Sequence, residues 1–134
     1  MNNKRTLKAI IYWLPALLYM VLIFWLSSFP APERVKDVPI ILKIKLVHLV
    51  EYGFLSFLFW LSLAKTTSLK PGEIAILAIM LTILFGATDE LHQVFVPFRT
   101  GSNIDIVADG AGAVIVQGAI LFFKREKGKA EPTS

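Results

Sequence analysis

The sequence predicts an all-α integral membrane protein, built as a four-helix bundle. Of its 134 residues, 55% are hydrophobic and only 18% are charged, and its mean hydropathy is +0.64. Soluble domains are less apolar, so this composition indicates a membrane protein. Four apolar runs are long enough to cross a hydrocarbon core of about 30 Å, which takes about 20 helical residues. Because backbone groups in lipid must be hydrogen-bonded within their own segment, each run should be a helix.

The predicted spans are approximately 9–28, 46–64, 73–96 and 104–123. The first contains Pro15 near its start, where proline should kink or locally unwind the helix. It is too long for the apolar region of a signal peptide and lacks a small-residue cleavage site, so we expect a retained anchor. Gly110 to Ala113 and Gly118 should let the fourth helix pack in the middle of the bundle. One membrane domain, 9–123, is therefore expected between an N-terminal tail, 1–8, and a basic C-terminal tail, 124–134.

Lysine and arginine are unevenly divided between the two sides of the predicted bundle. The side with both tails has nine: Lys4, Arg5, Lys8, Lys65, Lys70, Lys124, Arg125, Lys127 and Lys129. The other side has five: Arg34, Lys36, Lys43, Lys45 and Arg99. The positive-inside rule then predicts a multi-pass protein of the cell membrane with both termini cytoplasmic. Its basic tails favour anionic lipid headgroups, so membrane lipids are expected partners. No basic stripe with interleaved aromatics is present, and nucleic acid is not an expected partner.

Polar residues gather at the opposite, outer side. They are Lys45, His48, Glu51 and Tyr52 in the second span, Asp89, Glu90, His92 and Gln93 in the third, Arg99 in the following loop, and Asp105 and Asp109 in the fourth. A charged residue at the centre of a bilayer costs about 2.5 to 3.5 kcal/mol on insertion scales, so such a set favours a ligand or catalytic site. The i, i+3, i+4 spacing of Asp89, His92 and Gln93 predicts that these three share one helix face. Lys45, His48 and Tyr52 follow i, i+3, i+7.

Three stretches that carry these residues resemble a known family. "FWLSSFPAP", "KLVHLVEYGFLSFLFWLSL" and "TDELHQVFVPFRTGSNIDIVADGAGAVIV" are together similar to the VanZ-like family of small membrane proteins, named for a protein that accompanies teicoplanin resistance in Gram-positive bacteria. The family pattern falls on Asp89, Glu90, Gln93, Arg99, Asp105 and Asp109. The family more often has asparagine at the position of Asp109, followed by the glycine matched here by Gly112. The resemblance implies a cell-envelope role and lowered glycopeptide susceptibility, without an established reaction.

One interpretation is an enzyme that acts at the outer face on a lipid-linked or anionic envelope component. The catalytic groups would be Asp89, Glu90, His48 and Asp105, and the ligand-binding groups would be Lys45, Tyr52, His92, Gln93, Arg99 and Asp109. Proton transfer would fall to the carboxylates and imidazole, and Arg99 is suited to a forked contact with phosphate or carboxylate. Asp89, Asp105 and Asp109 supply hard oxygens, which leaves a divalent metal such as magnesium, calcium or manganese open.

Other interpretations use the same residues differently. The protein would bind a cell-wall precursor or a glycopeptide without changing it covalently, or would be a small proton-coupled transporter. A structural role is also open, in which Arg99 and Asp105 form an ion pair that pins the outer loop. The sequence contains no cysteine, which excludes thiol chemistry, and it has no His-Glu-x-x-His zinc motif and no Walker loop.

Overall fold

A computed structural model shows four consecutive α-helices. It describes residues 3–29, 38–99 and 101–130, except for the side chains of residues 5, 38–45 and 130. The helices are α1 (Asn3–Ser27), α2 (Val38–Thr66), α3 (Pro71–Gln93) and α4 (Asn103–Ala130). Each contains a segment long and apolar enough to cross a membrane. The predicted fold class, an all-α membrane protein with four helices, is confirmed.

The helices differ in length from the apolar runs that predicted them. α2 begins at Val38 rather than near 46, and α4 continues to Ala130 rather than ending near 123. Hydropathy marks only the part of a helix that suits lipid, whereas backbone hydrogen bonds continue through polar residues. α3 ends at Gln93, before the predicted 96, because the chain turns there: the Phe95 N–H donates to the His92 carbonyl and the Val96 N–H to that of Gln93, both at 3.0 Å.

The start of α3 is fixed by its first residues. Pro71 occupies the first turn, where a missing N–H costs no helical hydrogen bond. The Glu73 carboxylate accepts a hydrogen bond of 2.8 Å from the Lys70 backbone N–H, just before the helix. The short connection between α2 and α3 therefore turns the chain back within a few residues, and the two helices become neighbours.

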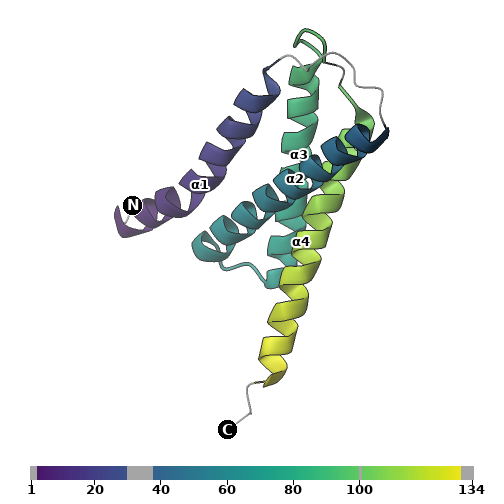
Figure 1. Ribbon diagram of the computed structural model, residues 1–134. Helices are drawn as coiled ribbons and strands as arrows, with labels where there is room; N and C mark the ends of the chain where they lie inside the picture. Colours follow the sequence, from purple (N-terminus) through teal and green to yellow (C-terminus); the bar gives the residue numbers. More distant parts are fainter. Residues whose placement is uncertain (1–2, 30–37, 100, 131–134) are drawn as a thin grey trace.

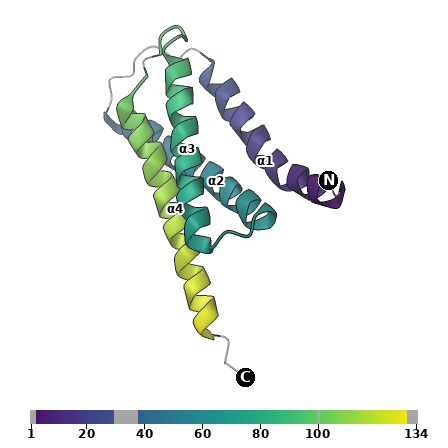
Figure 2. The same cartoon turned by 180° about the vertical axis from the view of Figure 1, so that it is seen from behind.

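Helices α2, α3 and α4 pack together, whereas α1 packs mainly against α2 and touches α3 only slightly. Figures 1 and 2 show α1 diverging from α3 and α4 toward its N-terminus, and the last turns of α4 extending beyond its neighbours. Two hydrogen bonds attach α1 to the far part of α2: Ser62 Oγ donates to the Tyr12 carbonyl at 2.6 Å, and Trp13 Nε1 donates to Thr66 Oγ1 at 3.2 Å.

Glycines allow α4 to approach α2 backbone to backbone. A Cβ placed on Gly112 would overlap the carbonyl oxygen of Leu49. A Cβ on Gly53 would lie 3.1 Å from Val116 Cγ2 and 3.3 Å from the Gly112 carbonyl oxygen. Small residues permit such close helix packing in membranes. α4 thereby contacts both α2 and α3. The predicted central position of the fourth helix is wrong, because α2 packs against all three other helices in the described structure, while the small residues of α4 serve its close contact with α2.

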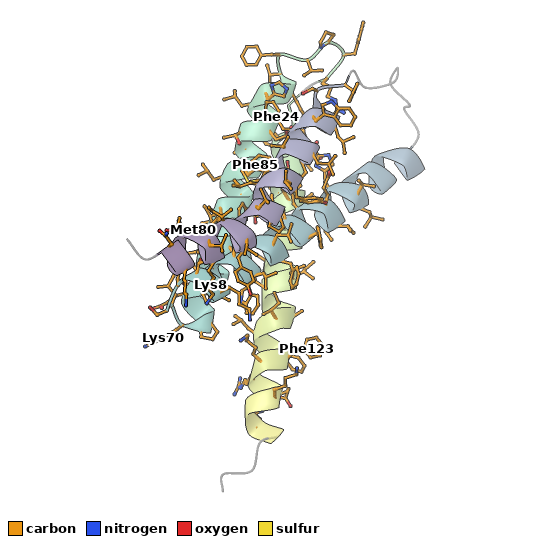
Figure 3. The ribbon with its side chains drawn as sticks, turned by 90° about the vertical axis from the view of Figure 1, so that its left-hand side faces the viewer. Lys8, Phe24, Lys70, Met80, Phe85 and Phe123 are labelled. Atoms are coloured by element: carbon orange, nitrogen blue, oxygen red, sulfur yellow. The ribbon has the colours of Figure 1, made fainter. Side chains whose placement is uncertain are left out.

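The two ends of the bundle differ in chemistry. Lys8 and Lys70 lie toward the end that carries both termini, and Phe24 lies near the other end (Figure 3). We call the second of these the polar end; there α1 and α3 finish and α2 and α4 begin. Between the ends, many large apolar side chains are exposed, for example Val21 at 66%, Met80 at 60% and Ile115 at 58%. Surfaces of this kind suit contact with lipid chains.

Candidate functional site

Three helices converge on the carboxylate of Asp89 at the polar end. Asp89 lies on α3 and is only 1% exposed. Its Oδ1 accepts a 2.6 Å hydrogen bond from Ser27 Oγ at the end of α1. Its Oδ2 accepts bonds from Tyr52 Oη of α2 at 3.3 Å and from Gln93 Nε2 of α3 at 2.8 Å. A buried carboxylate is costly without such donors, so this network both stabilises Asp89 and joins the three helices.

Arg99 extends this network to the surface. Its Nη1 donates to Gln93 Oε1 at 3.1 Å, and its Nε donates to the carbonyl oxygen of Phe29 at 2.9 Å. The side chain is partly exposed. Gln93 therefore links Arg99 to Asp89, while the guanidinium is held above the ends of α1 and α3. Within the described part of the chain, the second terminal nitrogen of Arg99 has no hydrogen bond.

Glu90 holds the loop between α3 and α4. It is 4% exposed, and its Oε2 accepts a 2.7 Å hydrogen bond from the Ser102 backbone N–H. Its Oε1 lies 3.4 Å from Gln93 Nε2. A Cβ on Gly101 would lie 2.9 Å from the Glu90 carbonyl oxygen, so the loop returns closely over the end of α3. The Glu90 carboxylate is thus engaged by the protein itself.

A second buried carboxylate pairs with a histidine. Asp109 on α4 is 0% exposed, and its Oδ1 lies 3.2 Å from His48 Nδ1 on α2. A carboxylate at Nδ1 orients an imidazole, and the side chain of His48 keeps 15% exposure. The other Asp109 oxygen, Oδ2, is buried without a hydrogen-bond partner in the described structure. A Cβ on Gly86 would come within 2.8 Å of that oxygen, so glycine at this position makes room for Asp109.

Tyr52 joins the two carboxylates. Its hydroxyl donates to Asp89, as described above, and its ring stacks on that of His48 with centroids 6.1 Å apart. It is 1% exposed, and a Cβ on Gly86 would lie 3.3 Å from its Cε1. Asp89, Tyr52, His48 and Asp109 therefore form one continuous buried group across α2, α3 and α4. We call this group, with Gln93 and Arg99, the polar cluster.

The remaining predicted residues lie outside the polar cluster or are not described. His92 stacks on Phe24 at 4.0 Å, and its Nε2 lies 3.0 Å from Ser28 Oγ; it shares no described hydrogen bond with Asp89. Asp105 stands in the first turn of α4, where its N–H donates to the Ser102 carbonyl at 2.9 Å. The side chain of Lys45 lies outside the described residues. Among residues 3–29, 38–99 and 101–130, no three His, Asp or Glu side chains are grouped to hold a metal ion.

Sequence reasoning missed several residues that build the polar cluster. Ser27 and Ser28, which close the apolar run of α1, bind Asp89 and His92. Gly86 gives Asp109 and Tyr52 their space, and Ser102 provides the N–H that binds Glu90. One sequence signal could have identified the two serines: they stand together at the end of a long apolar run. Because Asp89 stands near the end of another span, the serines and Asp89 could have been expected at the same end of the bundle.

Comparison with known proteins identifies the family. A search of curated proteins and a search of solved structures found no match. A family model described as VanZ/LLP1 matches residues 12–124, a range that includes α2, α3, most of α1 and α4, and the polar cluster. With four membrane-spanning helices and a match over most of its length, the chain is a multi-pass membrane protein that belongs to the VanZ-like family.

Proposed function

We propose that this protein acts in the bacterial cell envelope, with the polar end of the bundle on the outer face of the membrane. There it would handle a lipid-linked or anionic envelope component and lower susceptibility to teicoplanin. The orientation rests on the excess of lysine and arginine at the other end, which favours the cytoplasm. The observation that carries the proposal is the placement of Arg99, a partly exposed cation fixed above a buried polar network.

Arg99 is suited to hold an anion. A guanidinium stays charged and presents several donors in a fixed plane, which matches phosphate and carboxylate oxygens. Two of its donors are used to fix its position, on Gln93 and on the Phe29 carbonyl. The remaining donor nitrogen is available to a headgroup or to a cell-wall precursor. Because the guanidinium is already oriented, little side-chain entropy is lost when a ligand binds.

The His48–Asp109 pair favours an enzyme within this proposal. A buried carboxylate at Nδ1 fixes the imidazole and leaves Nε2 as the nitrogen that exchanges a proton with a ligand. Asp89 and Glu90, by contrast, already accept hydrogen bonds from several protein donors. We therefore assign proton transfer to His48, and we assign Asp89 and Glu90 to positioning.

A binder without catalysis is the second candidate. It is favoured by the hydrogen bonds that Asp89 and Glu90 accept within the protein, because these contacts assign both carboxylates to positioning rather than to a reaction. In this case the polar cluster would hold a cell-wall precursor or glycopeptide, and His48 would serve as one more contact. Replacement of His48 by glutamine separates the two: it should abolish turnover and leave ligand affinity in an enzyme, and should lower affinity alone in a binder.

The test is teicoplanin susceptibility of a sensitive Gram-positive host that expresses the full chain. We expect protection from the parent protein, and loss of that protection with Arg99→Gln at unchanged membrane abundance, because the ligand loses its charged contact. Lys129→Gln is the matched control, since Lys129 is an exposed cation at the opposite end, 61% exposed and paired with Glu126. Protection that survives Arg99→Gln, or no protection by the parent protein, would overturn the proposal.

A further inference from the structure

An open groove lies between α1 and α2, outside the polar cluster. It has a volume of about 460 Å³ and is lined by Tyr19 of α1 and by Leu46, Val47, Val50 and Glu51 of α2. All five residues lie within the membrane-spanning segments Thr6–Ser27 and Leu46–Thr66. The Tyr19 ring meets the Phe54 ring edge-on, with centroids 5.0 Å apart, and so bounds the groove toward the middle of the bundle. Figure 1 shows the divergence of the two helices that creates this opening.

The groove contains one carboxylate, that of Glu51. No hydrogen bond or ion pair of Glu51 occurs among the described residues, although Asp89, Glu90 and Asp109 each have one. Glu51 precedes Tyr52, but a helix turns about 100° per residue, which places Glu51 toward the groove rather than within the polar cluster. It lies within the membrane-spanning segment Leu46–Thr66. A carboxylate at that depth requires a donor.

The opposite wall supplies a second polar group. Tyr19 is partly exposed, and its hydroxyl makes no hydrogen bond within the described part of the chain. Between the two polar groups the surface is apolar and open: Leu46 is 53% exposed, Val47 60% and Val50 67%. A groove with this combination fits an amphiphile, with a polar head between Glu51 and Tyr19 and a hydrocarbon chain over the three aliphatic residues.

We infer that this groove binds a membrane phospholipid whose headgroup carries a primary ammonium group. The ammonium would donate hydrogen bonds to the Glu51 carboxylate, and the Tyr19 hydroxyl would donate to a phosphate or ester oxygen of the same lipid. Charge complementarity selects an ammonium headgroup over an anionic one. The position within the membrane span selects a lipid over a soluble amine, because lipid is the amphiphile present at that depth. This site uses neither Arg99 nor Asp89 as a ligand contact, although both residues act on Glu51 electrostatically. The inference goes beyond the proposed function, because it concerns a different groove and a different ligand.

The test measures which lipid the full-length protein retains. The purified protein in detergent is mixed with equal amounts of phosphatidylethanolamine, phosphatidylcholine and phosphatidylglycerol that have identical acyl chains, and bound lipid is counted by native mass spectrometry. Phosphatidylcholine keeps a positive charge but has no N–H donor, and phosphatidylglycerol has no cation. We expect the protein to retain about fivefold more phosphatidylethanolamine than phosphatidylcholine or phosphatidylglycerol. This is the preference that one partly solvent-shielded ion pair would give.

Three variants connect that preference to the groove. Glu51→Gln should abolish the preference, whereas Glu126→Gln, a matched change at a 50% exposed carboxylate in the last turns of α4, should preserve it. Val50→Trp should lower retention of the lipid by filling the groove, without disturbing the core, because Val50 is 67% exposed. Equal retention of the three lipids, an unchanged preference in Glu51→Gln, or a purified protein that retains no lipid would each overturn the inference. No antibiotic is involved, so the outcome is independent of the susceptibility test.

Discussion

Gly112→Ala should lower the free energy of unfolding by about 2 to 3 kcal/mol, which is a large effect for the addition of one methyl group. The added Cβ would overlap the carbonyl oxygen of Leu49, a backbone atom that cannot move unless α2 moves with it. The two helices would have to separate along their contact, which also includes Gly53 and Val116. Unfolding of the purified protein in detergent by added denaturing surfactant, followed by circular dichroism, measures the loss.

Gly118→Ala is the matched control for this prediction. Gly118 lies on the same helix, yet a Cβ placed there meets nothing within 4 Å. Its replacement should leave stability unchanged or raise it slightly, because alanine has the higher helix propensity. If the two substitutions lowered stability equally, close backbone packing of α2 against α4 would not be the source of stability.

Asp89→Leu should have the other large effect, a loss of about 2 to 4 kcal/mol. The substitution removes the common acceptor of Ser27, Tyr52 and Gln93, and leaves three donors from three helices without their partner in a buried position. Asp89→Asn should cost less, since the amide retains one acceptor oxygen in the same place. The same surfactant titration measures both variants, and equal stability of Asp89→Leu and the parent protein would show that Asp89 does not hold the helices together.

The membrane fold was predictable because the hydrocarbon core of a bilayer imposes one strong requirement on the hydropathy of each span. A span must be apolar and helical, and the four runs met that condition along their whole length. The ends of the helices were less predictable. α4 continues into polar sequence, where hydropathy drops but helical hydrogen bonds do not, and α2 begins earlier, in a segment where Lys43 and Lys45 interrupt apolar residues. The end of α3 depends on the turn that follows Gln93, for which an apolar run gives no signal.

The polar cluster was predictable only as a set of residues on shared helix faces. The spacing of Asp89 and Gln93 matches their hydrogen bond, and His48 and Tyr52 stack as an i, i+4 pair. His92 has the same spacing pattern, yet it stacks on Phe24 of α1. Which neighbour a face meets depends on how α1 crosses α2 and α3, and this is a property of the packed helices rather than of any one segment.

Contacts between side chains and backbone atoms could not be predicted from the sequence. Arg99 is fixed by the Phe29 carbonyl, and Glu90 by the Ser102 N–H, and neither partner has a side-chain signature. Gly112 was identified as a small packing residue and Gly86 was missed, and the atoms next to them, the Leu49 carbonyl and Asp109 Oδ2, come from other helices. Sequence patterns therefore named most of the polar cluster without assigning its partners.

The proposed function requires the polar end of the bundle to face the outside of the cell, and cysteine labelling tests this most directly. The chain contains no cysteine, so single cysteines report without background. Phe95, in the turn after α3, is 79% exposed, and Lys127 is exposed near the end of α4. A membrane-impermeant maleimide should label Phe95→Cys in intact cells and should label Lys127→Cys only after the membrane is permeabilised. Labelling of Lys127→Cys alone in intact cells would place the polar cluster in the cytoplasm and contradict the proposal.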